Sequence, residues 1–301
     1  MRLAQVLILT AVTLVAVPIS ALANPYDISL RGLGRPLDPN SEDDMANRRF
    51  RFLANELTMA LAPRPLAPAE TLGMDGFDVS LASTVTPISS QSRYWRGQAG
   101  TPVFEGVALG GGMPQVFWTP TAHIRKGLPM SMEIGITGSY LAWSEMFMLG
   151  VEYKICWQEA FWRWAPALAT RLAFSRLFGT SELSVIAGEA DVLASLPIGL
   201  GGMIQITPYL GYGQLFAHVD SMVIDETPFE VTDTQNDQKG GSSGSLYRFK
   251  TVEWQNNAHG RLVLGARLIV AFVEVLFEFN YMFMDGPNNL TSYTGKIGFD
   301  V

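Results

Sequence analysis

The chain has 301 residues, of which 48% are hydrophobic and 16% charged, and its formal net charge at pH 7 is −7. Soluble domains carry about 25% charged residues, so this chain is poor in charge, and its acidic balance argues against nucleic acid as a partner. Cys156 is the only cysteine, which excludes an internal disulfide.

Residues 1–23 have the pattern of a Sec-type signal peptide. Arg2 precedes a long apolar run, and Ala21-Leu22-Ala23 forms a small-residue cleavage site before Asn24. The alternative is a membrane anchor, against which Pro18 and the small residues at the end of the run argue. We therefore expect an exported chain whose mature form begins at Asn24.

Residues 24–75 differ in character from the rest of the chain. Met45–Leu61 is predicted to be a helix, with Ser41 as its N-cap and acidic residues around its first turn. Pro63, Pro65 and Pro68 then prevent its continuation. Two interpretations stay open for this region: a periplasmic arm packed under the next domain, or a plug inserted into it.

Residues 76–301 alternate between apolar and polar side chains, as half-exposed strands do. In Val273–Phe283, for example, valines and aromatic residues alternate with Glu274, Leu276, Glu278 and Asn280. Ser195–Tyr212 is uncharged over 18 residues, but its four glycines and two prolines make a spanning helix unfavourable. The predicted strands are 76–88, 114–126, 130–142, 145–158, 165–177, 182–194, 201–213, 259–270, 272–284 and 290–301.

Strands with one apolar and one polar face, in an exported chain without helical spans, predict an all-β fold: an antiparallel transmembrane β-barrel. About ten strands, an even number, would place both termini in the periplasm and the long loops 89–113 and 214–258 outside. Twelve strands are the alternative if loop 214–258 contains a hairpin. A soluble periplasmic sandwich is the remaining alternative for the fold.

The polar face carries charges of both signs, which a narrow barrel must pair in its lumen. The turn positions predict four pairs: Glu133 with Lys154, Glu152 with Arg171, Arg267 with Glu274, and Glu278 with Lys296. The full predicted lumen network is Glu133, Lys154, Glu152, Arg171, Glu189, Asp191, Arg261, Arg267, Glu274, Glu278 and Lys296.

The last residues alternate up to the end of the sequence, with Tyr293, Ile297, Phe299 and Val301 on one face. This ending resembles the C-terminal assembly signal of Gram-negative outer-membrane β-barrel proteins, which usually finish on Phe or Trp, whereas this chain finishes on Val. The resemblance is to an architecture and identifies no functional subfamily. It implies an outer-membrane location and three partners: membrane lipid, lipopolysaccharide and the barrel-assembly machinery. We expect a monomer.

Catalytic chemistry has a weak basis in the three histidines. His123 alternates with its strand and is expected to be a structural polar group. His218, Asp220 and Ser221 follow a predicted strand and could form a rim site in an outer-membrane hydrolase, with His259 where the same loop returns. No histidine or cysteine spacing fits a metal site, and no cofactor is expected.

The predicted function is therefore non-enzymatic: a narrow, porin-like passage for small solutes, or a structural barrel that presents its surface loops. Ten strands are close to the number whose lumen is filled by side chains. Tyr94, Trp95, Phe104 and Trp254 are candidate contacts in the outer loops. Membrane-interface positions are expected for Trp118, Trp143, Trp157, Trp162 and Trp164.

Overall fold

The computed structural model describes residues 26–98, 102–104, 112–159, 165–201, 204–225, 246–284 and 289–300. The signal peptide, Trp162, Trp164 and Val301 lie outside these residues. The helices are η1 (Leu30–Leu33), α2 (Met45–Leu61), α3 (Arg93–Arg96) and η2 (Trp254–Asn256). The strands are β1 (Phe77–Pro87), β2 (Val116–Leu128), β3 (Met132–Tyr140), β4 (Phe147–Gln158), β5 (Ala167–Phe178), β6 (Leu183–Ser195), β7 (Ile198–Gly199), β8 (Ile204–Ser221), β9 (Ile224–Asp225), β10 (Leu246–Tyr247), β11 (Ala258–Val270), β12 (Val273–Met282) and β13 (Leu290–Asp300).

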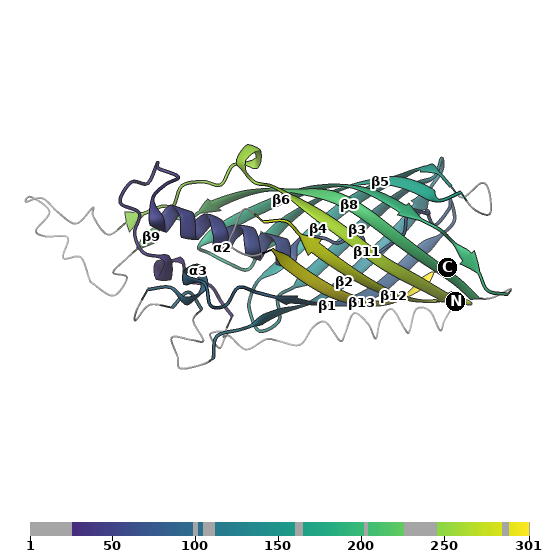
Figure 1. Ribbon diagram of the computed structural model, residues 1–301, viewed down its shortest axis with the longest axis horizontal. Coiled ribbons are helices and arrows are strands. Elements are labelled where there is room, and N and C mark those ends of the chain that lie inside the picture. The colour runs from purple at the N-terminus through teal and green to yellow at the C-terminus, as the bar shows by residue number, and fades with distance from the viewer. Residues whose placement is uncertain are drawn as a thin grey trace, which may run out of the picture.

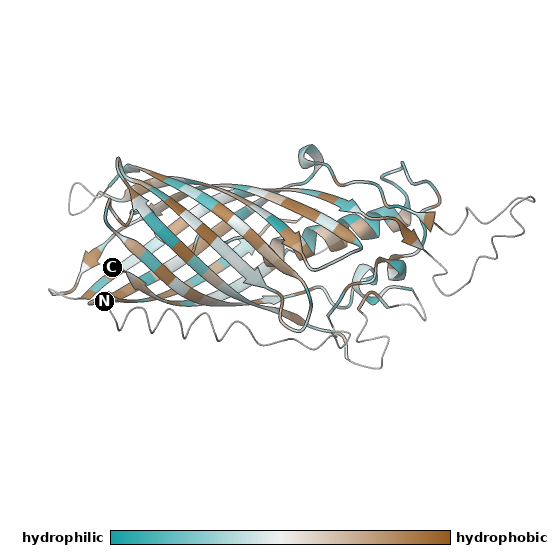
Figure 2. Ribbon diagram, turned by 180° about the vertical axis from the view of Figure 1, so that it is seen from behind, coloured by the Kyte–Doolittle hydropathy of each residue, from teal (hydrophilic) through white to brown (hydrophobic). Residues whose placement is uncertain are grey.

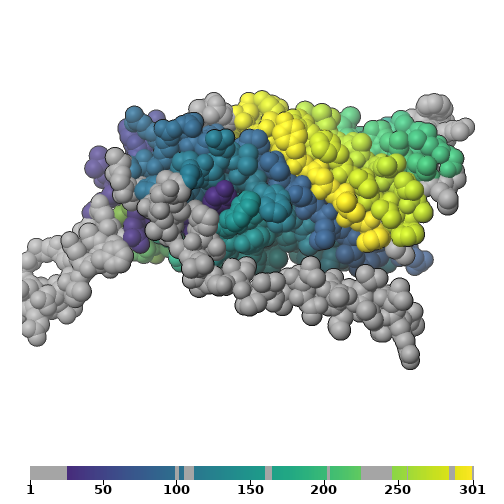
Figure 3. Space-filling model, turned by 90° about the horizontal axis from the view of Figure 1, so that it is seen from below, coloured from purple at the N-terminus to yellow at the C-terminus, as the bar shows by residue number. Residues whose placement is uncertain are grey.

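Ten antiparallel strands close into a barrel in the order β1-β2-β3-β4-β5-β6-β8-β11-β12-β13, with β13 paired to β1 (Figure 1). In the space-filling view the yellow of β13 runs beside the blue of β1 (Figure 3). The predicted ten-stranded antiparallel barrel is confirmed. Loop 214–258 does contain a short hairpin, β9–β10, but it forms a separate two-stranded sheet, so the twelve-strand alternative is wrong.

The barrel strands place apolar side chains outside and polar side chains inside. The side chains of Leu81, Ile136 and Ile297 are 60–69% exposed, and those of Phe174 and Phe277 are 58% exposed. Hydropathy therefore alternates along the strands (Figure 2). Because successive residues of a strand point to opposite sides, the intervening polar residues are buried in the lumen. This is the inverse of a soluble protein and the pattern expected of a barrel in lipid.

Two ends of the barrel can be distinguished. The C-terminal end holds Phe77 at the start of β1 and the Asp78–Asp300 pair of β1 and β13. At the opposite, distal end lie the described parts of the two long connections between β1 and β2 and between β8 and β11. At the C-terminal end β11 and β12 are joined by Ala271 and Phe272 alone, with Ala271 at a φ of 59°. No helix among the described residues is long and apolar enough to cross a membrane.

The segment before β1 runs through the lumen from the distal to the C-terminal end. Tyr26 N donates to Trp143 O at 3.1 Å, and Ile28 forms a β-bridge with Phe104, both at the distal end. The chain then passes through α2 and an extended stretch to reach Phe77 (Figure 1). The segment therefore lies in the lumen of the barrel and not beneath the barrel. Tyr26 and Asp300 therefore lie at opposite ends of the barrel, and the two chain termini themselves lie outside the described residues.

Helix α2 spans the predicted residues, but its N-cap is Asp44 and not Ser41. The Asp44 carboxylate accepts from Ala46 N at 2.9 Å and from Asn47 N at 3.3 Å. Ser41 instead accepts from Asp43 N in the preceding turn. Both residue types cap helices well, so the choice depended on where the backbone leaves the loop. At the other end Pro63 follows the C-cap residue Ala62 and prevents a further turn.

Candidate functional site

The lumen has two tiers, and the N-terminal segment matches each of them. The distal tier is apolar. Phe117, Leu141, Met148, Leu177, Val185 and Val219 of the wall pack there with Phe50, Leu53, Leu57 and Leu61 of α2. A helix satisfies its own backbone hydrogen bonds, so it can enter an apolar space without polar partners. This explains why the apolar tier receives a helix.

Glu56 of α2 is fully buried and binds the connection between β1 and β2 to the helix by hydrogen bonds. Its carboxylate accepts from Tyr94 Oη at 2.8 Å, Trp95 Nε1 at 2.9 Å and Ser89 N at 2.6 Å. Burial, and then the charge of Glu56, raise the pKa of Tyr94 to about 12. Tyr94, Trp95 and Phe104 are thus buried in the distal cap and do not form exposed contact points.

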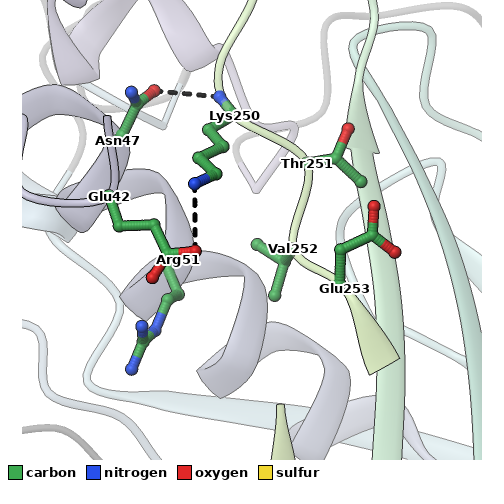
Figure 4. A pocket seen from close by; sticks show the side chains of 7 residues that line it. All are labelled: Glu42, Asn47, Arg51, Lys250, Thr251, Val252 and Glu253. Carbon is green, nitrogen blue, oxygen red and sulfur yellow. Dashed lines mark hydrogen bonds and ion pairs between the residues drawn. The ribbon is translucent and has the colours of Figure 1, made fainter. Parts of the chain in front are cut away.

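A second fastening joins the start of α2 to the other long connection (Figure 4). Lys250 Nζ lies 3.0 Å from Glu42 Oε1, and Lys250 N donates to Asn47 Oδ1 at 2.9 Å. The hydrogen bond from Lys250 and its positive charge lower the pKa of Glu42. The pocket between these residues has a volume of about 20 Å³, room for a water molecule and not for a ligand.

Toward the C-terminal end the lumen becomes charged, and its wall forms two ion clusters. In the first, Lys296 Nζ lies 2.7 Å from Glu274 and 3.5 Å from Asp78, and Arg125 lies 3.0 Å from Glu133 and 3.3 Å from Asp78. All five side chains are 2% exposed or less. Such buried charges are tolerated only when they are paired and hydrogen-bonded.

The second cluster is centred on Arg171. Its guanidinium lies 2.7 Å from Glu152, 3.1 Å from Glu189 and 2.5 Å from Asp191. Arg261 also pairs with Glu189. Three carboxylates around one guanidinium would repel each other strongly without the second cation, so Arg261 completes the charge balance.

The extended stretch that follows α2 crosses this charged tier and takes its hydrogen bonds from the wall. Arg261 donates to Pro63 O at 3.2 Å and Arg171 to Arg64 O at 3.3 Å. Lys296 donates to Leu66 O at 2.9 Å, and Lys154 to Pro68 O at 3.1 Å and Glu70 O at 2.9 Å. Four wall cations therefore donate to five of the eight backbone carbonyls between Pro63 and Glu70.

The prolines of this stretch fit the same arrangement. Pro63, Pro65 and Pro68 carry no N–H, so they leave carbonyl acceptors without adding donors that the lumen would have to satisfy. Two of the remaining donors find oxygen partners: Leu66 N donates to Glu278 at 3.0 Å and Ala69 N to Ser195 Oγ at 3.1 Å. An acceptor-rich chain thus lies against a cation-lined wall.

One predicted ion pair forms between directly opposite residues, as predicted. A second forms between diagonal neighbours. Glu133 is directly opposite Lys154, with their charged atoms 3.2 Å apart. Glu152 pairs with Arg171 at 2.7 Å, but diagonally, because its direct neighbour is Ala173.

The other two predicted pairs are wrong. Arg267 is opposite Leu276 and pairs with Glu70 of the N-terminal segment at 2.7 Å. Glu278 is opposite Thr294, two residues from Lys296, and accepts from Tyr209 Oη at 2.7 Å. The turns on both sides of β12 are displaced from the positions assumed, which moves every pair by two residues and leaves each side chain on the same face.

Sequence reasoning missed four members of the network: Asp78, Arg125, Arg64 and Glu70. Asp78 and Arg125 stand on the inward phase of their strands, so alternation could have found them. Arg64 and Glu70 belong to the N-terminal segment, and no periodicity marks their role. His123 is fully buried, and its Nε2 lies 2.8 Å from Glu152, in the structural position expected of it.

The hydrolase candidate does not assemble. His218 Nε2 lies 3.1 Å from Asp220 and its ring stacks on Trp254, all on the outer face of β8. Ser221 is the next residue after Asp220, so it points to the inner face, where its Oγ accepts from Phe249 N at 2.8 Å. The histidine and the serine are therefore on opposite sides of the strand. Among the described residues no group of His, Cys, Asp and Glu could hold a metal ion.

Interface aromatic residues occupy the outer surface near both ends. Trp118 and Trp143 are exposed and their rings are 5.5 Å apart at the distal end, with Tyr26 packed on Trp143. Trp157 is 71% exposed near the C-terminal end of β4. Exposed tryptophans at both edges of an apolar belt are typical of membrane–water interfaces.

Comparison with protein-family models finds no match to this sequence, and comparison with curated proteins finds none either. Among solved structures, the N-terminal β-barrel domain of Pseudomonas aeruginosa OprF is 8% identical over 76% of this chain and 99% of its own, with a TM-score of 0.30. The Acinetobacter baumannii outer membrane protein Omp33 is 9% identical over 75% and 98%, with a TM-score of 0.29.

The outer membrane enzyme PagL is 11% identical over 73% of this chain and 98% of its own, with a TM-score of 0.27. Likenesses this distant concern the barrel fold alone. They include an enzyme, and no activity is carried over from them. The chain folds as a closed ten-stranded antiparallel barrel of this general architecture, without a subfamily assignment.

Proposed function

We propose that this protein is a non-enzymatic outer-membrane β-barrel that is closed by its own N-terminal segment and holds a folded surface at its distal end. The observation that carries the proposal is the row of backbone carbonyls of residues 63–70 that accept hydrogen bonds from Arg171, Lys154, Lys296 and Arg261. A segment held in this way fills the lumen permanently, because its release would leave buried cations without acceptors.

An outer-membrane location is supported by the exposed apolar belt, the tryptophans at its edges and the alternating C-terminal strand. We further propose that the barrel-assembly machinery recognises the ending with Tyr293, Ile297, Phe299 and Val301, and that the signal peptide directs export. The first three side chains are on the outer, exposed face of β13. In this orientation the C-terminal end faces the periplasm and the distal end faces outward.

A narrow porin-like passage is the competing function, and the lumen argues against it. The apolar tier is filled by α2, and the charged tier is occupied by the extended stretch after it. Transport would require that segment to move. A rim hydrolase would need a nucleophile beside His218, and Ser221 lies on the other face.

The test is conductance through the purified, reconstituted barrel, before and after the segment is locked in place. Ala69 and Cys156 belong to one apolar cluster at the C-terminal end, so an Ala69→Cys variant offers a crosslink to the native cysteine. An Ala69→Cys/Cys156→Ala variant is the matched control, because it cannot form the crosslink.

We expect no steady current from the wild type or from the Ala69→Cys variant in either redox state. A wild-type current that the oxidised crosslink abolishes would establish a movable plug and a passage, and would refute the closed barrel. A current that persists after the crosslink has formed would show an open path beside the segment, and it would also refute the closed barrel.

A further inference from the structure

Four arginines lie at the distal end, on three helical elements that pack together: Arg31 of η1, Arg49 of α2, and Arg93 and Arg96 of α3. We call them the distal arginine patch. Arg49 Nη1 donates to Leu33 O at 3.2 Å, which ties α2 to η1. Gln98 N, just beyond α3, donates to Gly32 O at 2.8 Å. Figure 1 shows α3 beside the start of α2 at this end.

None of the four arginines of the patch forms an ion pair with another described residue. Within the part of the chain that the structure describes, the ion pairs made at the distal end, such as Arg48 with Asp43 at 3.7 Å and Lys250 with Glu42 at 3.0 Å, include none of the four arginines. The arginines inside the lumen, by contrast, all contact carboxylates or carbonyl oxygens. Four guanidiniums without an ion pair to a described residue, on elements that pack together, form a surface that fits an anionic partner.

Two of the guanidiniums have donors without adequate acceptors. Arg31 Nε is buried and has no hydrogen-bond partner. Arg49 Nη2 contacts Met45 Sδ at 3.2 Å, and a thioether is only a weak acceptor. Arg93 and Arg96 are exposed on α3. A buried N–H without a partner is costly, so Arg31 Nε can still take an acceptor, and the half-exposed and exposed guanidiniums beside it have donors to offer the same group.

The level of the patch along the barrel suggests the class of that acceptor. Trp118 and Trp143, with Tyr26 packed on the latter, mark the distal edge of the apolar belt, which is where lipid headgroups lie. Arg31 follows Tyr26 by five residues, and an extended chain covers at most about 3.6 Å per residue, which keeps Arg31 within roughly 18 Å of that edge.

We propose that the distal arginine patch binds the phosphate groups of a phosphorylated lipid of the outer leaflet. Arginine presents planar pairs of N–H donors that match phosphate oxygens bidentately. A lipid is favoured over a soluble polyanion because the patch is next to the membrane interface. This inference rests on the proposed outer-membrane location. It also gives a reason for the passage of the N-terminal segment through the lumen: the segment delivers Arg31 and Arg49 to the outer face.

The test measures lipid binding to the purified full-length barrel in detergent by native mass spectrometry. The probes are diphosphorylated lipid A and the same lipid after enzymatic dephosphorylation. The variants are Arg31→Gln and the double variant Arg93→Gln/Arg96→Gln, and Arg48→Gln is the matched control, since Arg48 is an exposed arginine of α2 that pairs with Asp43. Slower gel mobility after heating confirms that each variant is folded.

We expect the wild type and Arg48→Gln to bind diphosphorylated lipid A equally, and the patch variants to bind it at least about tenfold more weakly, as the loss of a charge-assisted hydrogen bond implies. The dephosphorylated lipid should bind all proteins weakly. Equal binding by all variants, or equal binding of the two lipids, would overturn the proposal.

Dextran sulfate serves as a soluble competitor. The competing outcome is that dextran sulfate binds the patch more tightly than the lipid does. If it displaced lipid A from the wild type while its concentration of sulfate groups was below the concentration of lipid A phosphate groups, the partner would be a polymer and the lipid proposal would be wrong. Cell fractionation tests the membrane location separately, because the binding assay in detergent does not depend on where the protein resides.

Discussion

Replacement of Lys296 by methionine should destabilise the barrel strongly. The Lys296 amine is 2.7 Å from Glu274, 3.5 Å from Asp78 and 2.9 Å from Leu66 O, and the side chain is 1% exposed. Methionine retains most of the aliphatic volume and removes the charge and the donors. Glu274 would then keep one cation, Arg125, at 3.8 Å.

The magnitude follows from these contacts. Removal of one partner from a buried ion pair costs about 3–5 kcal/mol, and the orphaned Leu66 carbonyl adds about 1 kcal/mol. The free energy of unfolding would be measured by urea titration of the barrel in lipid vesicles, followed by tryptophan fluorescence. Combination with Glu274→Gln should show a coupling energy of about 1–3 kcal/mol, because the two residues share one interaction.

Glu189→Gln is the control for this cycle. Glu189 belongs to the Arg171 cluster and shares no partner with Lys296, so the two effects should add. A loss below about 1 kcal/mol for Lys296→Met would refute the reasoning about buried charge. A larger coupling of Lys296 to Glu278 than to Glu274 would instead place the β12–β13 register two residues away from the one described.

Three further outcomes are expected. Gly265→Ala should cost about 1–3 kcal/mol, because its Cβ would lie 2.2 Å from the Tyr209 ring, whereas Gly295→Ala faces open space and should be nearly neutral in the same unfolding assay. Since the pKa of Tyr94 is about 12 in the folded protein against 10.0 in the unfolded chain, stability should fall as the pH rises from 10.0 toward 12, and Tyr94→Phe should remove that slope. In Glu56→Gln, tyrosinate absorbance from Tyr94 should appear at lower pH, and an unchanged titration would contradict the described Glu56 contact.

Alternation in the sequence determined the class of fold and the number of barrel strands. A two-residue period is a local property, and in lipid it must separate apolar from polar faces, so every predicted strand overlaps an observed one. The strand 201–213 was predicted too short, because β8 continues to Ser221 beyond the apolar belt. There His218 and Asp220 still alternate with buried residues, but without the contrast in hydropathy that marks a lipid-facing strand.

Register and the place of the N-terminal segment were decided by the tertiary structure. A slip of two residues keeps every side chain on its face, so the sequence could not tell that Lys296 pairs with Glu274 and not with Glu278. The proline-rich stretch after α2 was equally compatible with an arm and with a plug. Only the closed wall brings cations from four different strands to one row of carbonyls, because contacts so distant in sequence arise when the barrel closes.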